Sequence, residues 1–242
     1  MSPESSPFEA IAIDGPAASG KSTVARILAE RLDLTMVNSG EMYRAVTLAT
    51  VSRGVDPRDP AAVASLASKI DLSCVIENGS SLILLDGEHP GEMLRSDRVN
   101  SAVSSVAAVS EVRSILVKLQ RGLLRHSDLV MEGRDIGSVV FPDTPYKIYI
   151  AASEKVRRQR RAAEGQADSV EERDRLDSAR KDSPLVIPEG AEVIDSSNMT
   201  IEDVVEASLA LLTARGWFSR HSEIGPTPFS VLRRDCSGGK DL

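Results

Sequence analysis

Cysteine is scarce in this chain of 242 residues, which contains only Cys74 and Cys236. Two cysteines form no disulfide framework, and these two lack the CxxC spacing of a metal site, so a reducing, cytoplasmic location is expected. Aromatic residues make up only 3% of the chain. Few side chains are therefore available to stack on single-stranded bases.

Basic residues are not in excess either. The chain has 29 Lys and Arg against 36 Asp and Glu, a formal charge of −7. Sequence-independent binding to nucleic acid needs a cationic surface, so no nucleic-acid partner is expected. No run approaches the roughly 18 apolar residues of a membrane-spanning helix, and residues 1–9 lack the pattern of a signal peptide. We expect neither membrane insertion nor export.

Along the chain, segments with the apolar pattern of a buried strand alternate with segments that have the apolar spacing of a helix. Short apolar runs predict five buried strands, at 8–13, 34–37, 128–131, 147–150 and 193–195. Apolar residues spaced three and four apart predict helices from near Ser22, over 41–53, over 112–123 and over 201–213. This alternation is typical of an α/β protein with a parallel sheet and right-handed crossovers. We predict a five-stranded parallel sheet flanked by helices.

One stretch departs from this pattern. The runs 72–76 and 82–85 are joined by a loop with Asn78-Gly79, a strong hairpin signal, and a helix is expected over 96–109. We interpret 70–109 as a small inserted subdomain, with the core in 1–69 and 110–216. Residues 154–181 are dense in charge of both signs, which predicts two solvated helices with a mobile connection around Gly165. The tail, 217–242, shows no periodicity and is expected to be loose or to dock late, with Trp217 and Phe218 as packing residues.

A phosphate-binding loop follows the first predicted strand. Residues 15–22, GPAASGKS, match the pattern GxxxxGK[ST] and open a helix, which is the context that supports the motif. Backbone N–H groups of such a loop, together with the helix N-terminus, bind phosphate. Lys21 would reach the β- and γ-phosphates, and the Ser22 hydroxyl would hold Mg²⁺. The loop alone indicates a nucleoside triphosphate, because GTPases, motors and small-molecule kinases share it.

Further clusters suggest a second anion site. Arg44 lies one turn into the helix that follows the second strand, and Arg134 and Asp135 follow the strand at 128–131. Both places are at the edge where open α/β sheets bind ligands. Five arginines in the charge-rich segment could stabilise a phosphoryl group in transfer, namely Arg157, Arg160, Arg161, Arg173 and Arg180. A helix cap, a glycine turn and a solvated helix pair are the plainer interpretations of these clusters.

Taken together, these segments resemble bacterial cytidylate kinase over about residues 9–213. The motifs that carry the resemblance are IDGPAASGKST, NSGEMYRAV, MEGRDIGSVVFPD with KIYIAAS after it, and ERDRLDSARKDSPL. The resemblance implies a P-loop kinase fold with a core, a monophosphate-binding insertion and a short lid, which would lie at about 157–181. It also implies transfer of the ATP γ-phosphoryl group to CMP or dCMP with Mg²⁺, by a monomer.

Position by position, the resemblance implies roles for individual residues. ATP would be bound by Gly15, Pro16, Ala17, Ala18, Ser19, Gly20, Lys21, Ser22 and Thr23. Cytosine contacts would fall on Ser39, Arg113, Asp135 and Arg180, pentose contacts on Ser104, Arg173 and Asp177, and acceptor-phosphate contacts on Arg44 and Arg134. The catalytic set would be Lys21, Arg134, Asp135, Arg157 and Arg161. The chain departs from the family at Asn38, where Asp is usual, and at Glu41, where a small residue is usual.

Two other functions fit the phosphate-binding loop. One is a kinase for a different small acceptor, such as UMP or a metabolite alcohol, which steady-state rates across acceptors would distinguish. The other is a nucleotide-binding switch, which hydrolyses little and signals through shape. A switch needs no second anion site, and failure of CMP to accelerate ATP turnover would favour it.

Overall fold

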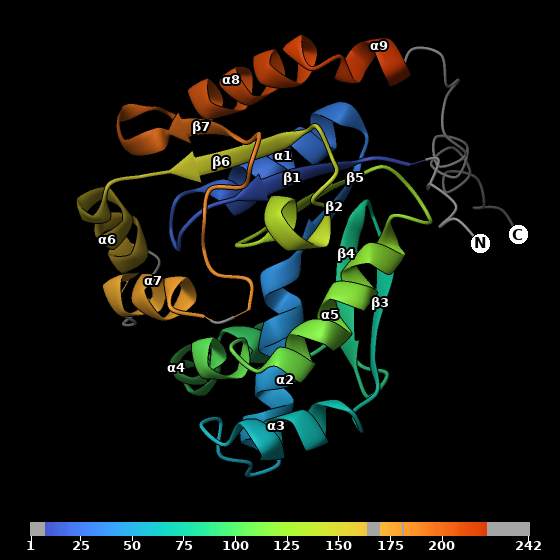
Figure 1. Ribbon diagram of the computed structural model, residues 1–242, viewed down its shortest axis with the longest axis vertical. Coiled ribbons are helices and arrows are strands. Elements are labelled where there is room, and N and C mark those ends of the chain that lie inside the picture. The colour runs from blue at the N-terminus through green and yellow to red at the C-terminus, as the bar shows by residue number, and fades with distance from the viewer. Residues whose placement is uncertain (1–7, 164–169, 181, 222–242) are drawn as a thin grey trace, which may run out of the picture.

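The computed structural model describes residues 8–163, 170–180 and 182–221. Its centre is a seven-stranded sheet in the order β3-β4-β2-β5-β1-β6-β7 (Figure 1). The strands are β1 (Ala10–Asp14), β2 (Thr35–Asn38), β3 (Leu72–Glu77), β4 (Ser80–Leu85), β5 (Leu129–Gly133), β6 (Lys147–Ala151) and β7 (Glu192–Asp195). All pairings are parallel except that of β3 with β4. The predicted α/β class is confirmed.

Helices cover both faces of this sheet. They are α1 (Lys21–Leu32), α2 (Ser39–Ser52), α3 (Pro60–Ala67), α4 (Asp97–Val106), α5 (Ser110–Leu123), α6 (Glu154–Ala163), α7 (Val170–Ser178), α8 (Ile201–Ala214) and α9 (Trp217–His221). Three short turns of other helix types are η1 (Gly91–Arg95), η2 (Ile136–Val140) and η3 (Ser196–Asn198). In Figure 1, α1 and α8 lie on one side of the strands and α2 to α5 on the other.

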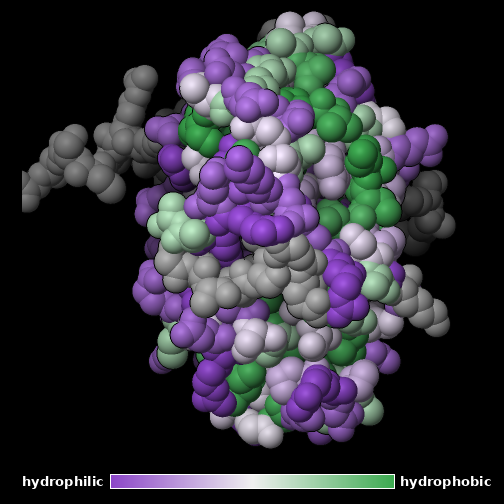
Figure 2. Space-filling model, turned by 90° about the vertical axis from the view of Figure 1, so that its left-hand side faces the viewer, coloured by the Kyte–Doolittle hydropathy of each residue, from purple (hydrophilic) through white to green (hydrophobic). Residues whose placement is uncertain are grey.

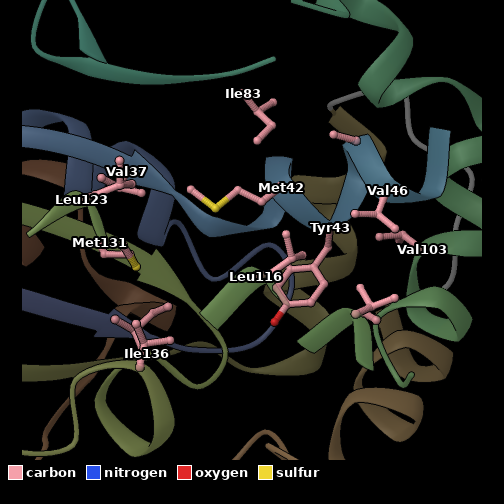
Figure 3. Close-up of a cluster of buried hydrophobic side chains, with 14 of the residues drawn as sticks. Val37, Met42, Tyr43, Val46, Ile83, Val103, Leu116, Leu123, Met131 and Ile136 are labelled. Carbon is pink, nitrogen blue, oxygen red and sulfur yellow. The ribbon is translucent and has the colours of Figure 1, made fainter. Parts of the chain in front are cut away.

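The central strands have two buried faces, which explains their continuous apolar runs. Because successive side chains point to opposite faces, Ala10 and Ala12 of β1 face one core while Ile11 and Ile13 face the other. The first core, part of which is shown in Figure 3, packs under α2, α4 and α5. The second packs under α1 and α8. The main sheet is thereby held rigid between two helical layers.

The hairpin differs from its predicted placement. The sequence analysis expected five strands and a hairpin apart from the sheet, whereas β4 pairs with β2 through Met36 and Ser80 and extends the sheet to seven strands. The single pair of residues at this junction explains why strand periodicity did not reveal it. The five parallel strands themselves form as predicted.

A helix that the sequence analysis did not predict, α3, follows α2. The Asp59 side chain caps it by accepting a hydrogen bond from the Ala62 N–H at 3.0 Å, and Pro60 occupies its first turn. Both are ordinary start signals for a helix. The helix was missed because its eight residues are too few for a clear periodicity.

The start of the predicted loose tail is ordered against the core. Trp217, at the start of α9, is only 2% exposed, and its ring meets that of Tyr146 edge to face at 4.7 Å. For 217–221 the chain is therefore docked and not loose, and Trp217 is a packing residue as predicted. The remainder of the tail, 222–242, lies outside the described residues, as does the predicted mobile connection around Gly165.

Helices α6 and α7 lie at the end of the sheet toward which β6 runs (Figure 1). Figure 2 views this side of the molecule, where hydrophilic side chains gather, in accord with the predicted charge-rich helices. Within the described part of α6, Arg157 is the buried residue. No helix in the described ranges is long and apolar enough to cross a membrane.

Candidate active site

A cleft opens at the carboxyl ends of the central strands. Parallel pairing puts Asp14 level with Gly133, and Asn38 level with Glu132, so the segments after β1, β2 and β5 meet at one edge. The cleft has a volume of about 350 Å³, within the range of roughly 300–1,000 Å³ usual for ligand sites. Its walls also include α4 and α7 residues.

The phosphate-binding loop forms one end of this cleft. Gly15 is required where the loop passes β6, because a Cβ there would lie 2.3 Å from the Ile150 carbonyl oxygen. Gly20 has a φ of 91°, which favours glycine directly before α1. Lys21 is buried and donates from Nζ to the Pro16 carbonyl oxygen at 3.1 Å. The loop therefore curls around the amine that the sequence analysis assigned to phosphates.

Glu132, at the end of β5, connects to both key residues of the loop. Its carboxylate accepts a hydrogen bond from Ser22 Oγ at 2.9 Å and lies 3.8 Å from Lys21 Nζ. The sequence analysis quoted Glu132 within a motif without giving it a role. The signal that could have found it is an acidic residue at the end of the strand adjacent to the phosphate-loop strand.

Asp14 fixes the turn after β5 to the start of the phosphate-binding loop. Its two carboxylate oxygens accept hydrogen bonds from the N–H groups of Ile136 and Gly137, both at 2.7 Å. Burial raises the pKa of this carboxyl from 3.8 to about 7, against the lowering effect of the two N–H groups. This link was not predicted. It joins Asp14 to residues that lie 122 and 123 positions later in the chain.

Asp14 should make the stability of the protein depend on pH. Because its pKa is raised in the fold, the folded state binds the proton more tightly than the unfolded state. Its stabilising contribution is full below pH 3.8 and is lost as the pH rises through about 7. The free energy of unfolding of the wild type minus that of Asp14→Asn should therefore fall across this window. Urea denaturation of both proteins measures it, and a constant difference would refute the shift.

A buried ion pair lies at the wall of the cleft. Arg113 Nη2 of α5 donates to Asp135 Oδ2, and its Nη1 donates to the Ala107 carbonyl oxygen at 3.0 Å. Arg113 and Asp135 are each 3% exposed. The guanidinium lies 5.1 Å from the centre of the Tyr43 ring, a cation–π contact. Asp135 lines the cleft with Arg113 behind it, so the carboxylate is held in one orientation.

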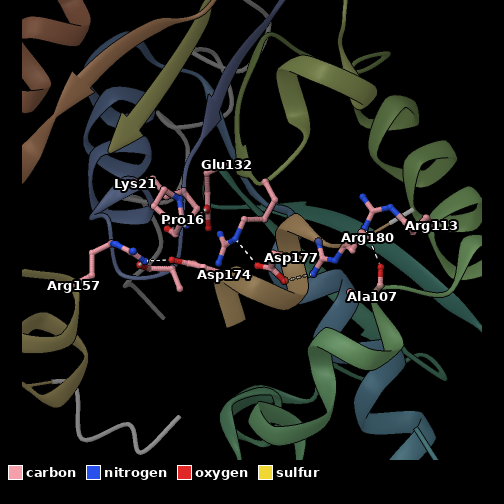
Figure 4. Close-up of polar contacts among 11 residues, drawn as sticks. Pro16, Lys21, Ala107, Arg113, Glu132, Arg157, Asp174, Asp177 and Arg180 are labelled. Carbon is pink, nitrogen blue, oxygen red and sulfur yellow. Dashed lines mark hydrogen bonds and ion pairs between the residues drawn. The ribbon is translucent and has the colours of Figure 1, made fainter. Parts of the chain in front are cut away.

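A second carboxylate, Asp177 of α7, holds two arginines (Figure 4). It accepts from Arg134 Nε at 2.9 Å through Oδ2 and from Arg180 through Oδ1. All three residues line the cleft, and Asp177 is 3% exposed. Helix α7 is therefore tied to Arg134, which follows β5.

Arg44 connects α2 to the insertion. Its Nη1 donates to the Leu94 carbonyl oxygen at 2.9 Å and to Asn100 Oδ1 at 2.6 Å. Ser39, at the start of the same helix, donates to the Glu132 carbonyl oxygen at 2.8 Å. The helix start, the insertion and the end of β5 are thereby brought around one cavity.

Two arginines of α6 contact the phosphate-binding loop. Arg157 donates to Asp174 and to the Ala17 carbonyl oxygen, the latter at 3.4 Å. Arg160 donates to the Ser19 carbonyl oxygen at 3.0 Å. Their positive charges therefore lie against the loop that would hold the donor phosphates.

The structure brings most of the predicted site residues to the cleft. Those in its lining are Ala17, Ala18, Gly20, Lys21, Ser22, Thr23, Ser39, Arg44, Ser104, Arg134, Asp135, Arg161, Asp177 and Arg180. Gly15, Pro16 and Ser19 instead shape the loop, and Arg113 and Arg157 act from behind the lining. Of the predicted set, the Arg173 side chain lies outside the part of the structure that is described.

A phosphate-binding loop facing a second set of arginines across one cleft is the arrangement of a nucleotide-dependent kinase, in which two phosphates approach each other. The family model for cytidylate kinase matches residues 11–214. The cytidylate kinase of Rhodococcus jostii (strain RHA1) is 43% identical over 217 residues, covering 85% of this chain and 95% of its own. That of Clostridium botulinum (strain Loch Maree / Type A3) is 40% identical, with coverages of 84% and 96%. That of Pelotomaculum thermopropionicum is 43% identical, with coverages of 86% and 97%.

The chain belongs to the cytidylate kinase family. It is an ATP-dependent nucleoside monophosphate kinase, and its reaction is phosphorylation of CMP or dCMP, as the sequence analysis predicted. Both the phosphoryl donor and the acceptor are nucleotides. The reaction does not require a general base, because the acceptor phosphate is already largely ionised at neutral pH.

Proposed function

We propose that the cleft carries out this reaction with the donor phosphates on the 15–23 loop and the acceptor phosphate at Arg44 and Arg134. The observation that carries the proposal is the position of the buried Arg113–Asp135 pair, whose carboxylate lines the same cleft as Lys21. A carboxylate accepts a hydrogen bond from the exocyclic amine of cytosine and would repel the carbonyl that uracil has there. Ser39 and Arg180 would complete the contacts to the base.

The remaining residues divide between the pentose and the transferred group. Ser104 and Asp177 line the cleft where the pentose contacts are proposed, and Arg173 is assigned there by the resemblance alone. Lys21, Arg157 and Arg161 would stabilise the charge on the γ-phosphoryl group during in-line transfer. Positioning and electrostatic stabilisation are the main contributions, because phosphoryl transfer leaves little covalent work to the protein.

Binding without the donor tests the acceptor side. Calorimetric titration with CMP, UMP and cytidine is expected to give the tightest binding for CMP. UMP lacks the amine that Asp135 would accept from, and cytidine lacks the phosphate that Arg44 and Arg134 would bind. Equal affinities for CMP and UMP would remove Asp135 as the reader of the base.

Mg²⁺ is the metal that we propose for the donor site. Ser22 Oγ and the Glu132 carboxylate, which lie 2.9 Å apart, are hard oxygen groups of the type that Mg²⁺ prefers. The described residues contain no cluster of three His, Cys, Asp or Glu side chains that could hold a metal unaided. This fits an ion that takes most of its ligands from phosphates and water. When bound, Mg²⁺ neutralises charge that develops between the β- and γ-phosphates.

Replacing Glu132 with glutamine should raise the Mg²⁺ concentration required for half-maximal rate by about tenfold. The amide keeps the size of the side chain, but it removes the negative charge 3.8 Å from Lys21 Nζ and beside Ser22. Initial rates across a magnesium titration at saturating CMP measure the effect. Glu189→Gln, an exposed change outside the cleft, is the control. An unchanged magnesium dependence in the Glu132 variant would exclude this residue from the metal site.

We also propose the division of the chain into functional parts. Residues 1–69 and 110–216 would form the core, 70–109 the acceptor-binding subdomain, and about 157–181 the lid. The support is that α4 and the 91–95 turn supply cleft residues from the insertion, while Asp177 and Arg180 do so from the lid. A monomeric, cytoplasmic enzyme is proposed on the family resemblance and on the low cysteine content.

A further inference from the structure

An ion pair unrelated to the predicted contacts lies at the wall of the cleft. Arg95, the last residue of η1, donates from Nη2 to Glu41 Oε1 at 3.3 Å. Both residues line the cleft, and the Arg95 side chain is 57% exposed against 25% for Glu41. The pair therefore connects α2 to the insertion on the side of the cleft where Arg44 lies.

The two side chains of this ion pair differ in conformational freedom. Glu41 is in the first turn of α2, where a carboxylate is favoured by the helix dipole. The Arg95 backbone is fixed by its carbonyl oxygen, which accepts from Asn100 Nδ2 at 2.9 Å, and Asn100 also binds Arg44. The Arg95 side chain, by contrast, is long and exposed, so its guanidinium can rotate to another position at little cost in free energy. Arg95 can therefore change partner while Glu41 and Arg44 keep their places.

A carboxylate in this position opposes the binding of a phosphate. The proposed acceptor carries a dianionic phosphate toward Arg44 and Arg134, which lie in the same lining as Glu41. Like charges in one cleft repel each other. Glu41 would also compete with that phosphate for Arg95, because one guanidinium cannot pair fully with both.

We propose that Glu41 is an affinity-setting residue for the acceptor. Its carboxylate holds Arg95 before the acceptor binds and weakens the binding of the acceptor phosphate. The inference rests on the proposed placement of that phosphate at Arg44 and Arg134. Glu41 touches no reacting atom in this scheme, and it acts through charge alone.

A second ion pair of α2 provides a matched control. Arg53, which follows the helix, pairs with Asp86, which follows β4, at 2.5 Å. Like the first pair, it joins one end of α2 to the insertion, and it is partly exposed, at 41% and 51%. Neither Arg53 nor Asp86 lines the cleft. Asp86→Asn therefore removes an equivalent carboxylate without changing the charge in the cleft.

The test compares Glu41→Gln with Asp86→Asn by calorimetric titration in the absence of ATP, with CMP and cytidine as the probes. Glu41→Gln is expected to lower the Kd for CMP by about three- to tenfold and to leave the Kd for cytidine within twofold, because cytidine carries no phosphate. Asp86→Asn should change neither. The gain in CMP affinity should shrink in 0.5 M salt, where charges are screened within about 4–5 Å.

Two results would overturn the proposal. An unchanged or weaker CMP affinity in Glu41→Gln would mean that the carboxylate does not oppose the phosphate. An equal change for CMP and cytidine would mean that Glu41 shapes the cleft and does not act by charge. Failure of the proposed acceptor site would show differently, because the wild type itself would then bind CMP no more tightly than cytidine.

Discussion

Lys21→Ala is expected to lower kcat by about two to three orders of magnitude, the usual cost of removing one preorganised group that stabilises transition-state charge. Lys21 is 6% exposed, and its amine donates a hydrogen bond to the Pro16 carbonyl oxygen within the phosphate-binding loop. It is therefore in place before the donor phosphates arrive, so its loss removes charge stabilisation during the transfer. Steady-state rates at saturating ATP and CMP measure the effect.

The variant should remain folded, because Lys21 lies beside the cleft and not in either apolar core. Circular dichroism and the thermal midpoint check this. Lys69→Ala, a change at an exposed lysine after α3, removes the same charge far from the loop and should leave kcat within twofold. A Lys21 variant with wild-type kcat would contradict the assignment of the loop to the donor.

Asp135→Asn is expected to lower kcat/KM for CMP by about a hundredfold and to reduce the preference for CMP over UMP by at least about tenfold. In the proposed site the wild-type carboxylate would accept a hydrogen bond from the amine of cytosine, whereas the amide of Asn would also donate one to the carbonyl of uracil. The change also leaves Arg113 buried without its counterion. Breaking such a pair typically costs about 3–5 kcal/mol in the free energy of unfolding.

The ratio of kcat/KM for CMP to that for UMP separates the two effects, because a general loss of stability lowers both rates alike. Asp143→Asn, at an exposed position after η2, is the matched control and should change neither the ratio nor the rates. An unchanged ratio in the Asp135 variant would show that the base is read elsewhere in the cleft.

Much of the fold could be predicted because its signals are local. The helix near Ser22 and the strands around it follow from apolar periodicity within about ten residues, and the structure places α1 at Lys21–Leu32. The phosphate-binding loop is likewise a contiguous motif with its own context of strand and helix. The α/β class follows from the order of these elements.

The parts that could not be predicted depend on contacts between distant residues. The pairing of β4 with β2 consists of Met36 and Ser80, and no local sequence pattern predicts such a pair. Asp14 binds backbone groups 122 and 123 residues away, and Glu132 binds Ser22 across 110 residues. Sequence reasoning gives the types of groups at each strand end, but the register of the parallel sheet decides which of them meet.

The arginines proposed for the acceptor phosphate also combine a predictable position with a contact that could not be predicted. Arg44 and Arg134 could be placed near the ligand edge from their positions after strands, and both line the cleft. That Arg134 shares a carboxylate with Arg180 could not be predicted, because the connection runs from β5 to α7. The ion pair between Glu41 and Arg95 could not be predicted either, because the two residues are 54 positions apart. The sequence indicates only that Glu41 departs from the family.

The central claim is tested most directly by measuring ADP formation from ATP and Mg²⁺ with CMP, dCMP, UMP or no acceptor. We predict a large increase with CMP and dCMP, a much smaller one with UMP, and very slow turnover without an acceptor, because the proposed site would hold the acceptor phosphate at Arg44 and Arg134, in the same cleft as the loop. Turnover that is the same with and without CMP would contradict the account and would indicate a nucleotide-binding switch instead.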